Sequence, residues 1–276
     1  MIGISNSLFK ANVVAGGVTY DADAQAYFTA NTAITSSADK NAINTFYLGL
    51  KSDGIYTKIK AMYLPIWGSA SSSKWNLVNP ADTNAAFRLT FATGFTFSSG
   101  GMLPNGTSAY ADTFLAPSSA YSSADSKHLS FYSRTNAATS GASSTIGSDN
   151  GSTAFCRMTV RGASNQLAHV YGGTNGTYGS TETSSLGFYL ANRSTSSASQ
   201  LYKNGSLVGN GNSTNGTSSQ ITQTLLISAA RSGASIVYYD NKQCAFASIG
   251  DSLTSTEVTN FNTRLNTLMT YFGINV

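Results

Sequence analysis

The sequence predicts a mainly β protein: an antiparallel jelly-roll sandwich, preceded by a short helical region and followed by a C-terminal helix that packs on the sandwich. Three observations lead to this prediction. From about residue 62, apolar residues recur in short runs of period two, separated by turns rich in Gly, Asn and Ser. Residues 200–209, QLYKNGSLVG, have the pattern of a tight hairpin. Near the end of the chain the apolar period changes to three and four, which indicates a helix.

The helical region is expected over residues 21–61. Residues 21–30, DADAQAYFTA, carry acids in the first turn, where the helix dipole favours them. A second helix begins at Ser36 with Asp39 three residues later, which is a capping pattern. Its apolar face consists of Ile43, Phe46, Tyr47 and Leu50. One or two further helical turns are expected before Pro65, because Ile55, Ile59 and Met62 follow at helical spacing.

The jelly-roll domain is expected over residues 62–276. Within residues 128–134, Leu129 and Phe131 alternate with polar neighbours, which predicts a half-buried antiparallel strand. The Asn204-Gly205 pair predicts a type I′ turn, because both positions favour positive φ. This hairpin is therefore interpreted as a device of the fold rather than as a ligand contact.

The C-terminal helix is expected over residues 254–272. Thr254 and Glu257 form a capping box at its start, and Gly273 is the expected C-terminal cap. One apolar stripe consists of Val258, Phe261, Leu265, Leu268 and Phe272. This stripe should dock the helix on the sandwich.

Composition and charge exclude some classes of partner. The chain has 276 residues, of which 10% are charged, and its net charge is +4; a typical protein has about 25% charged residues. Lys51, Lys58 and Lys60 are the densest group of cations, and they do not line up as a patch. We therefore expect no nucleic-acid partner, since that binding needs several aligned cations. No apolar run approaches the ~18 residues that span a bilayer, so no membrane insertion is expected.

Residues 1–20 are expected to form an arm that makes an assembly contact, and the protein is expected to be a homo-oligomer. The segment is too apolar for a solvated tail but has no clear amphipathic period; its apolar residues are Ile2, Ile4, Leu8, Phe9, Val13 and Val14. The alternative is a first strand added to the edge of the jelly roll itself.

Several stretches together carry a family resemblance. In chain order they are DADAQAYF, NAINTFYLGLKSDGIYTKIKAMYLPIWG, KWNLVNP, FRLTF, LPNGTSAYADTFL, HLSFYSRT, QLYKNGSLVG and FASIGDSLTSTEVTNFNTRLNTLMTYFGINV. From about Tyr20 to Val276 the chain resembles bacteriophage structural proteins with a concanavalin A-like, laminin-G-like jelly-roll domain. The resemblance implies a virion component, such as a capsid decoration, head fibre or tail-associated protein, with other capsid or tail proteins as partners. It supplies no catalytic motif.

We therefore expect a non-enzymatic structural protein exposed on the virion. The alternative is a carbohydrate-binding adhesin, or receptor-binding protein, that contacts a host surface polysaccharide. A glycoside hydrolase is a more remote alternative, since that chemistry needs paired carboxylates. The chain has only two Glu, Glu182 and Glu257, and neither has an Asp at the spacing of the β-glucanases. Neither His128 nor His169 is accompanied by a Gly-x-Ser-x-Gly motif.

No cofactor is expected, and calcium is the one candidate ion. Asp149 and Asn150 lie in the turn SDNGS and could contribute oxygen ligands. The alternative is an Asx turn closed by Gly. Cys156 and Cys244 lie in apolar, strand-like stretches and are expected to be buried free thiols.

A sugar could bind at a Gly-rich loop over residues 171–181, YGGTNGTYGST. This loop brings Tyr171, Asn175 and Tyr178 together, and aromatic faces with amide groups suit a shallow saccharide site. The alternative is a long solvated loop without a ligand. Trp67 and Trp75 lie in an aliphatic context and are expected in the core.

Overall fold

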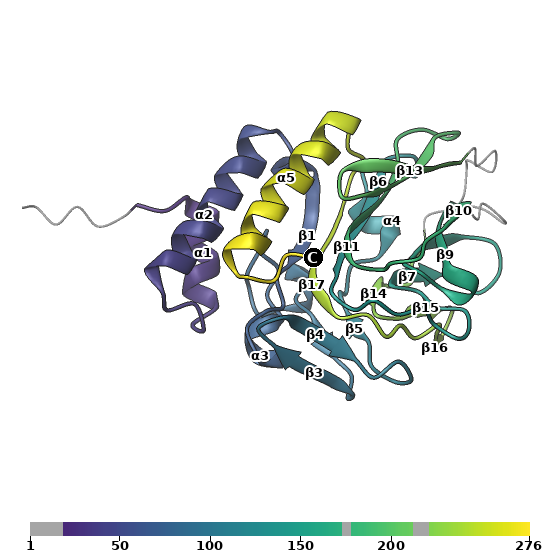
Figure 1. Ribbon diagram of the computed structural model, residues 1–276, viewed down its shortest axis with the longest axis horizontal. Helices are drawn as coiled ribbons and strands as arrows, with labels where there is room; N and C mark the ends of the chain where they lie inside the picture. Colours follow the sequence, from purple (N-terminus) through teal and green to yellow (C-terminus); the bar gives the residue numbers. More distant parts are fainter. Residues whose placement is uncertain (1–18, 173–177, 212–220) are drawn as a thin grey trace, which may run out of the picture.

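The computed structural model of the chain describes residues 19–172, 178–211 and 221–276. The expected assembly arm lies almost entirely outside this part, so its role stays a prediction. Within it, two β-sheets and a group of helices form three layers (Figure 1). The prediction of a mainly β sandwich with a C-terminal helix is confirmed.

The first sheet, sheet A, lies between the helices and the second sheet. In spatial order it contains β13 (Ser206–Gly211), β12 (Ser199–Lys203), β11 (Gly187–Arg193), β6 (Lys127–Ser133), β17 (Cys244–Gly250), β4 (Gly101–Pro104) and β3 (Phe95–Ser98). β1 (Ile59–Tyr63) also pairs with β17, antiparallel, with Tyr63 opposite Ala247. β17 is thus paired along both of its sides.

The second sheet, sheet B, is mixed. In spatial order it contains β10 (Tyr178–Thr181), β9 (Gln166–Gly172), β8 (Phe155–Thr159), β7 (Ile146–Asp149), β14 (Leu226–Ile227), β5 (Ala111–Asp112) and β2 (Thr90–Phe91). β15 (Ala230–Ser232) pairs antiparallel with β16 (Ser235–Val237) but parallel with β7. The expectation of two purely antiparallel sheets therefore fails at this one pairing.

The longer helices form the third layer. They are α1 (Ala22–Ala30), α2 (Ser37–Ser52) and α5 (Ser255–Tyr271). The short helices are α3 (Ala70–Ser73) and α4 (Pro117–Ala120), with 3-10 turns at Tyr56–Lys58, Asn84–Ala86 and Ala163–Asn165. In the described part of the chain, no helix combines the length and apolarity that crossing a membrane would require.

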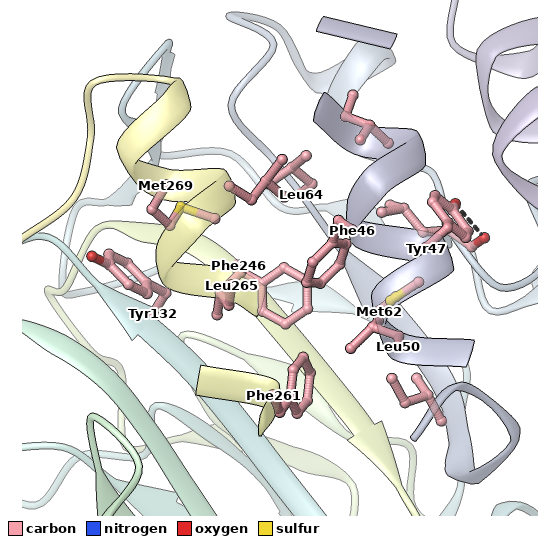
Figure 2. Close-up of a cluster of buried hydrophobic side chains, with 14 of the residues drawn as sticks. Phe46, Tyr47, Leu50, Met62, Leu64, Tyr132, Phe246, Phe261, Leu265 and Met269 are labelled. Atoms are coloured by element: carbon pink, nitrogen blue, oxygen red, sulfur yellow. Dashed lines mark hydrogen bonds between the residues drawn. The ribbon is translucent and has the colours of Figure 1, made fainter. Parts of the chain in front are cut away.

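Two hydrophobic cores lie on the two faces of sheet A. The core between the sheets holds Leu129 and Phe131 of β6 and both cysteines, which are free and buried as expected. The core on the other face lies between sheet A and the helices, and Figure 2 shows its centre. Its labelled side chains are Phe46, Tyr47, Leu50, Met62, Leu64, Tyr132, Phe246, Phe261, Leu265 and Met269.

Strand β6 corrects one expectation. The alternation of Leu129 and Phe131 with polar residues predicts a half-buried strand, but all seven residues of β6 are buried. The polar-side neighbour Tyr132 belongs to the helix-side core, because α5 covers that face of the sheet. Both faces of the strand are buried, because sheet B covers one face and the helical layer covers the other.

The junction between the helical region and the sandwich also differs from expectation. Ile59 and Met62, expected to extend a helix, lie on strand β1, and the boundary expected at residue 62 falls inside that strand. Local spacing suited a helix, but pairing with the distant β17 decides the outcome. Residues 21–61 have no core separate from that of α5 and sheet A.

The start of α5 is built as predicted. The Thr254 hydroxyl accepts a hydrogen bond from the Glu257 backbone N–H at 3.2 Å, and the Glu257 carboxylate accepts one from the Thr254 N–H at 2.7 Å. Lys58, just before β1, also contacts Glu257 at 2.6 Å. The capping box therefore ties the last helix to the first strand.

The Asn204-Gly205 hairpin forms as predicted, and it is held by more than its turn. Both residues have positive φ, 49° and 78°, as a type I′ turn requires. The Asn204 side-chain oxygen accepts a hydrogen bond from the Phe188 N–H at 2.8 Å, which joins the turn to β11. A Cβ added to Gly205 would lie 3.2 Å from Asn262 Cβ, so the turn also packs closely on α5.

We expect Asn204→Ala to lower the free energy of unfolding by about 1–3 kcal/mol, because it leaves the Phe188 N–H without its acceptor and forces Ala into a left-handed conformation. Urea denaturation measures the change. Ser206→Ala, an exposed residue two positions on, is the matched control and should change it by less than about 0.5 kcal/mol. Equal midpoints for the two variants would show that the turn contributes nothing specific.

Candidate functional site

The structure leaves the predicted sugar loop untested. Tyr171 lies in β9 and Tyr178 begins β10, opposite His169, so the two strands bring both tyrosines near the end of the same hairpin. Asn175 lies outside the described residues, and for the two tyrosines the structure describes only the backbone. The role of Tyr171, Asn175 and Tyr178 in sugar binding stays a prediction.

The calcium candidate has the geometry of a turn. The Asn150 side-chain oxygen accepts hydrogen bonds from the N–H groups of Ser152, Thr153 and Ala154 at 2.9–3.0 Å. The Asp149 carboxylate accepts one from Gly151 N–H at 2.9 Å and lies 3.6 Å from Arg157. These oxygens are engaged by the chain's own donors, which favours the Asx-turn interpretation. Among the described residues, no group of three or more Cys, His, Asp or Glu is arranged to hold a metal ion.

Most of the described carboxylates are held in ion pairs, and Asp39 instead accepts a hydrogen bond from Tyr271. Glu182 contacts Lys203 at 2.9 Å, while Asp21 and Asp23 share Lys51. In Asp21, Asp251 and Glu257 burial raises the pKa, but lysine partners outweigh it and the net shift is downward; in Asp82 the hydrogen bond from Lys74 lowers the pKa directly. A general acid needs a raised pKa. None of these groups has one.

A Ser–His pair that the sequence did not reveal lies inside sheet A. His128 Nε2 is 3.0 Å from the Ser248 hydroxyl, and His128 Nδ1 is 2.6 Å from the Asp251 carbonyl oxygen. A nucleophile and base need this kind of contact. However, His128 and Ser248 are both fully buried, and burial lowers the pKa of His128 to about 4. The pair has no access to a substrate and is interpreted as a satisfied polar contact between β6 and β17.

The two tryptophans of the chain lie on either side of α3, next to the helical layer. β1 ends at Tyr63, and Gly68, with φ +74°, turns the chain after Trp67. Ser69 then caps α3 by accepting a hydrogen bond from the Ser72 N–H. Trp67 and Trp75 pack against the helix-side core but remain partly exposed. The expectation that both are core residues is therefore met in part: both contact the core, and neither is fully buried.

These tryptophans line two open hollows. The first, here called the Trp75 hollow, has a volume of about 410 Å³. Its wall includes Asn31, Thr32, Ser69, Ser71, Lys74 and Trp75. The second, here called the Phe272 hollow, has a volume of about 390 Å³. Its wall includes Asp39, Ile66, Gly68, Ser99 and Phe272. Both hollows are also lined by Ala33 and Trp67.

Hydrogen bonds fix Trp67 in place. Its indole N–H donates to the Tyr27 hydroxyl at 2.8 Å, and the Asn31 amide donates both to Tyr27 at 3.3 Å and to the Ser72 carbonyl at 3.0 Å. Phe272 packs edge-on against the indole with ring centroids 5.7 Å apart. Burial raises the pKa of Tyr27, so its hydroxyl stays protonated. The indole is therefore anchored on its core side while its outer edge faces the hollows.

One carboxylate, Asp82, pairs with the two cations beside the Trp75 hollow. The Lys74 ammonium lies 4.7 Å from the Trp75 ring centroid and contacts Asp82 at 2.6 Å. Asp82 also lies 3.4 Å from Arg88. The hollow thus offers two aromatic side chains, several hydroxyl groups and one ammonium that contacts a carboxylate. This combination suits a neutral, hydroxyl-rich ligand.

Comparisons with known proteins support the fold. No protein-family model matches the chain, and no curated protein matches it. Trypanosoma rangeli sialidase in complex with 2,3-difluoro-KDN has 12% identity and a TM-score of 0.55, covering 81% of this chain and 39% of that one. The same sialidase with sialic acid has 10% identity and a TM-score of 0.52, covering 82% and 39%. The chain thus spans about two fifths of the sialidase's length.

A smaller solved domain is also similar. Domain 4 of AbnA, a GH43 extracellular arabinanase from Geobacillus stearothermophilus, was solved with arabinotriose; it has 10% identity and a TM-score of 0.46, covering 74% of this chain and 98% of that one. At such identities a likeness concerns the fold alone, and a TM-score this low supports no argument. The sialidase likeness shows a mainly β arrangement in common.

We expect stability to fall as pH drops from about 6.5 to about 4, because the unfolded state binds a proton at His128 in this range and the folded state does not. The loss from this residue should reach up to about 3 kcal/mol at pH 4. His128→Asn should remove that part of the pH dependence, as measured by urea denaturation at several pH values. A wild-type curve that is flat across this range, or an unchanged slope in the variant, would contradict the assignment.

Proposed function

We propose that the protein is a non-enzymatic carbohydrate-binding protein and that the Trp75 and Phe272 hollows are its binding site. The observation behind the proposal is that both tryptophans of the chain line the Trp75 hollow and remain partly exposed. Sugars combine an apolar C–H face, which packs on aromatic rings, with hydroxyls, which need donors and acceptors. Trp67 and Trp75 supply the aromatic contact, and the hydroxyl groups of Ser69, Ser71 and Ser72 supply the polar contact.

The absence of catalysis is part of the proposal. Glycosidases need one carboxyl group with a raised pKa beside a second carboxylate. In the part of the chain that the structure describes, the carboxyl groups with resolved shifts all have lowered pKa values. Glu182 and Glu257 are each paired with a lysine. The sialidase of similar fold was solved with sialic acid, which agrees with sugar binding.

The finer fold class also belongs to the proposal. We infer a concanavalin A-like, laminin-G-like jelly roll from the sequence resemblance, with which the two packed sheets and the β12–β13 hairpin agree. The same resemblance is the basis for placing the protein on a bacteriophage particle. In that setting its partners are capsid or tail proteins, and the bound sugar belongs to the host surface.

We expect Trp75→Ala to lower the affinity for a neutral glycan at least tenfold, because it removes an aromatic wall of the Trp75 hollow. A glycan array identifies the ligand, and titration calorimetry measures the change. Circular dichroism shows whether the variant stays folded. Tyr238→Ala is the matched control, since it removes a partly exposed aromatic residue on the sheet B side and should leave affinity unchanged. Absence of any array signal from the wild type, or equal affinity of Trp75→Ala, would contradict the proposed function.

We expect deletion of residues 1–17 to leave the melting temperature unchanged and to abolish oligomerisation or attachment to particles, because an apolar segment outside the folded domain needs a partner to cover it. Size-exclusion chromatography with light scattering measures the oligomer, and differential scanning calorimetry measures the melting temperature. A loss of several degrees with attachment retained would show that the segment is a strand of the sandwich.

A further inference from the structure

The two hollows are neighbours that share part of their lining. Both are lined by Ala33 and Trp67, and their remaining walls come from different segments. The Trp75 hollow lies toward α3, and the Phe272 hollow lies toward the end of α5 and the loop that carries Ser99. Because both are lined by Trp67, the two hollows adjoin each other at this residue, and together they are here called the trough, with Trp67 as its ridge.

The two halves offer different chemistry. The Trp75 hollow is lined by hydroxyl groups and by Lys74, so it is rich in donors. The Phe272 hollow is more apolar, and its one charged wall residue is Asp39, an acceptor. Asp39 Oδ1 already accepts a hydrogen bond from the Tyr271 hydroxyl at 2.9 Å, which fixes its orientation. A ligand that occupies both halves therefore meets donors in one and a carboxylate in the other.

The ridge between the halves is rigid and open. Trp67 donates a hydrogen bond to Tyr27 and packs edge-on against Phe272. Gly68 follows it directly, and a Cβ added there would meet no atom within 4 Å. No side chain of residue 68 therefore stands over the ridge, and a chain-like ligand can pass from one half to the other.

We infer that the trough binds a neutral oligosaccharide chain across two consecutive subsites, with the glycosidic linkage lying over Trp67. This inference rests on the proposed function and specifies its ligand. A single sugar unit would fill only one hollow and leave the contacts of the other unused. A polyanionic chain is disfavoured, because the Asp39 carboxylate would repel it in the Phe272 hollow.

Chain length is the first measurement. Gluco-, manno- and galacto-oligosaccharides of one to four units are titrated into the full-length protein, with oligogalacturonates of the same lengths as the anionic comparison. We expect the affinity of the best neutral series to rise at least tenfold from one unit to two and to change little beyond two or three. Oligogalacturonates should bind at least tenfold more weakly than the neutral series.

Blocking variants are the second measurement. Ser71→Trp and Ser99→Trp place a bulky side chain at an exposed position of the Trp75 and Phe272 hollows, respectively. Each should reduce disaccharide affinity at least tenfold, whereas only one of them should reduce monosaccharide affinity. Ser152→Trp, at an exposed position in the β7–β8 turn, should change neither.

The outcomes separate the two proposals. Monosaccharide binding that is blocked by one variant, with no gain from longer chains, overturns the two-subsite inference and leaves the proposed function standing. Tighter binding of oligogalacturonate overturns the neutral ligand class. No binding of any neutral or anionic series overturns the inference and the proposed function together.

Discussion

The packing of Phe261 against sheet A is the contact on which the rest of the structure depends. Its ring lies 5.8 Å from Phe246 of β17 and 5.3 Å from Phe188 of β11, centroid to centroid, in edge-on geometry. Phe46 of α2 then packs on Phe246 at 5.9 Å (Figure 2). Without this layer the central strands would expose large aromatic surfaces. The layer also holds α1 and the segment with Trp67, so the core that stabilises the sandwich shapes the candidate site.

Local signals in the sequence were sufficient for some elements and not for others. Helix α5 and the Asn204-Gly205 hairpin were predicted because a capping box and a type I′ turn each depend on residues within four positions of one another. Ile59 and Met62 were not assigned to a strand, because their spacing fits a helical period equally well. Their partners on β17 are almost two hundred positions away, and no local sequence pattern indicates a pairing at that distance. The double burial of β6 was missed for a similar reason, since a polar residue such as His128 looks solvent-facing until α5 covers it.

The candidate site also depends on long-range packing that local sequence patterns do not indicate. Trp67 and Trp75 were assigned to the core, and most of each side chain does pack there. Whether an edge of a core tryptophan stays exposed depends on what the fold leaves uncovered, and the sequence does not state this. One signal was available: the run SASSS at residues 69–73 lies between the two tryptophans, and small hydroxyl residues beside aromatic ones cannot close over them. The loop with Tyr171 and Tyr178 was predicted to bind a sugar only because it is rich in Gly and also contains Tyr and Asn.

The position of β17 has a consequence for how the chain is made. This strand lies between β6 on one side and β1 and β4 on the other, yet it comes almost last in the sequence. Before residues 244–250 are synthesised, β1 and β6 have no strand between them, and α5 is not yet available to pack on Phe188 of β11. A nascent chain therefore cannot complete this sheet until β17 and α5 have emerged from the ribosome. Until then the apolar face of β6 and β11 is open to chaperones that bind apolar segments.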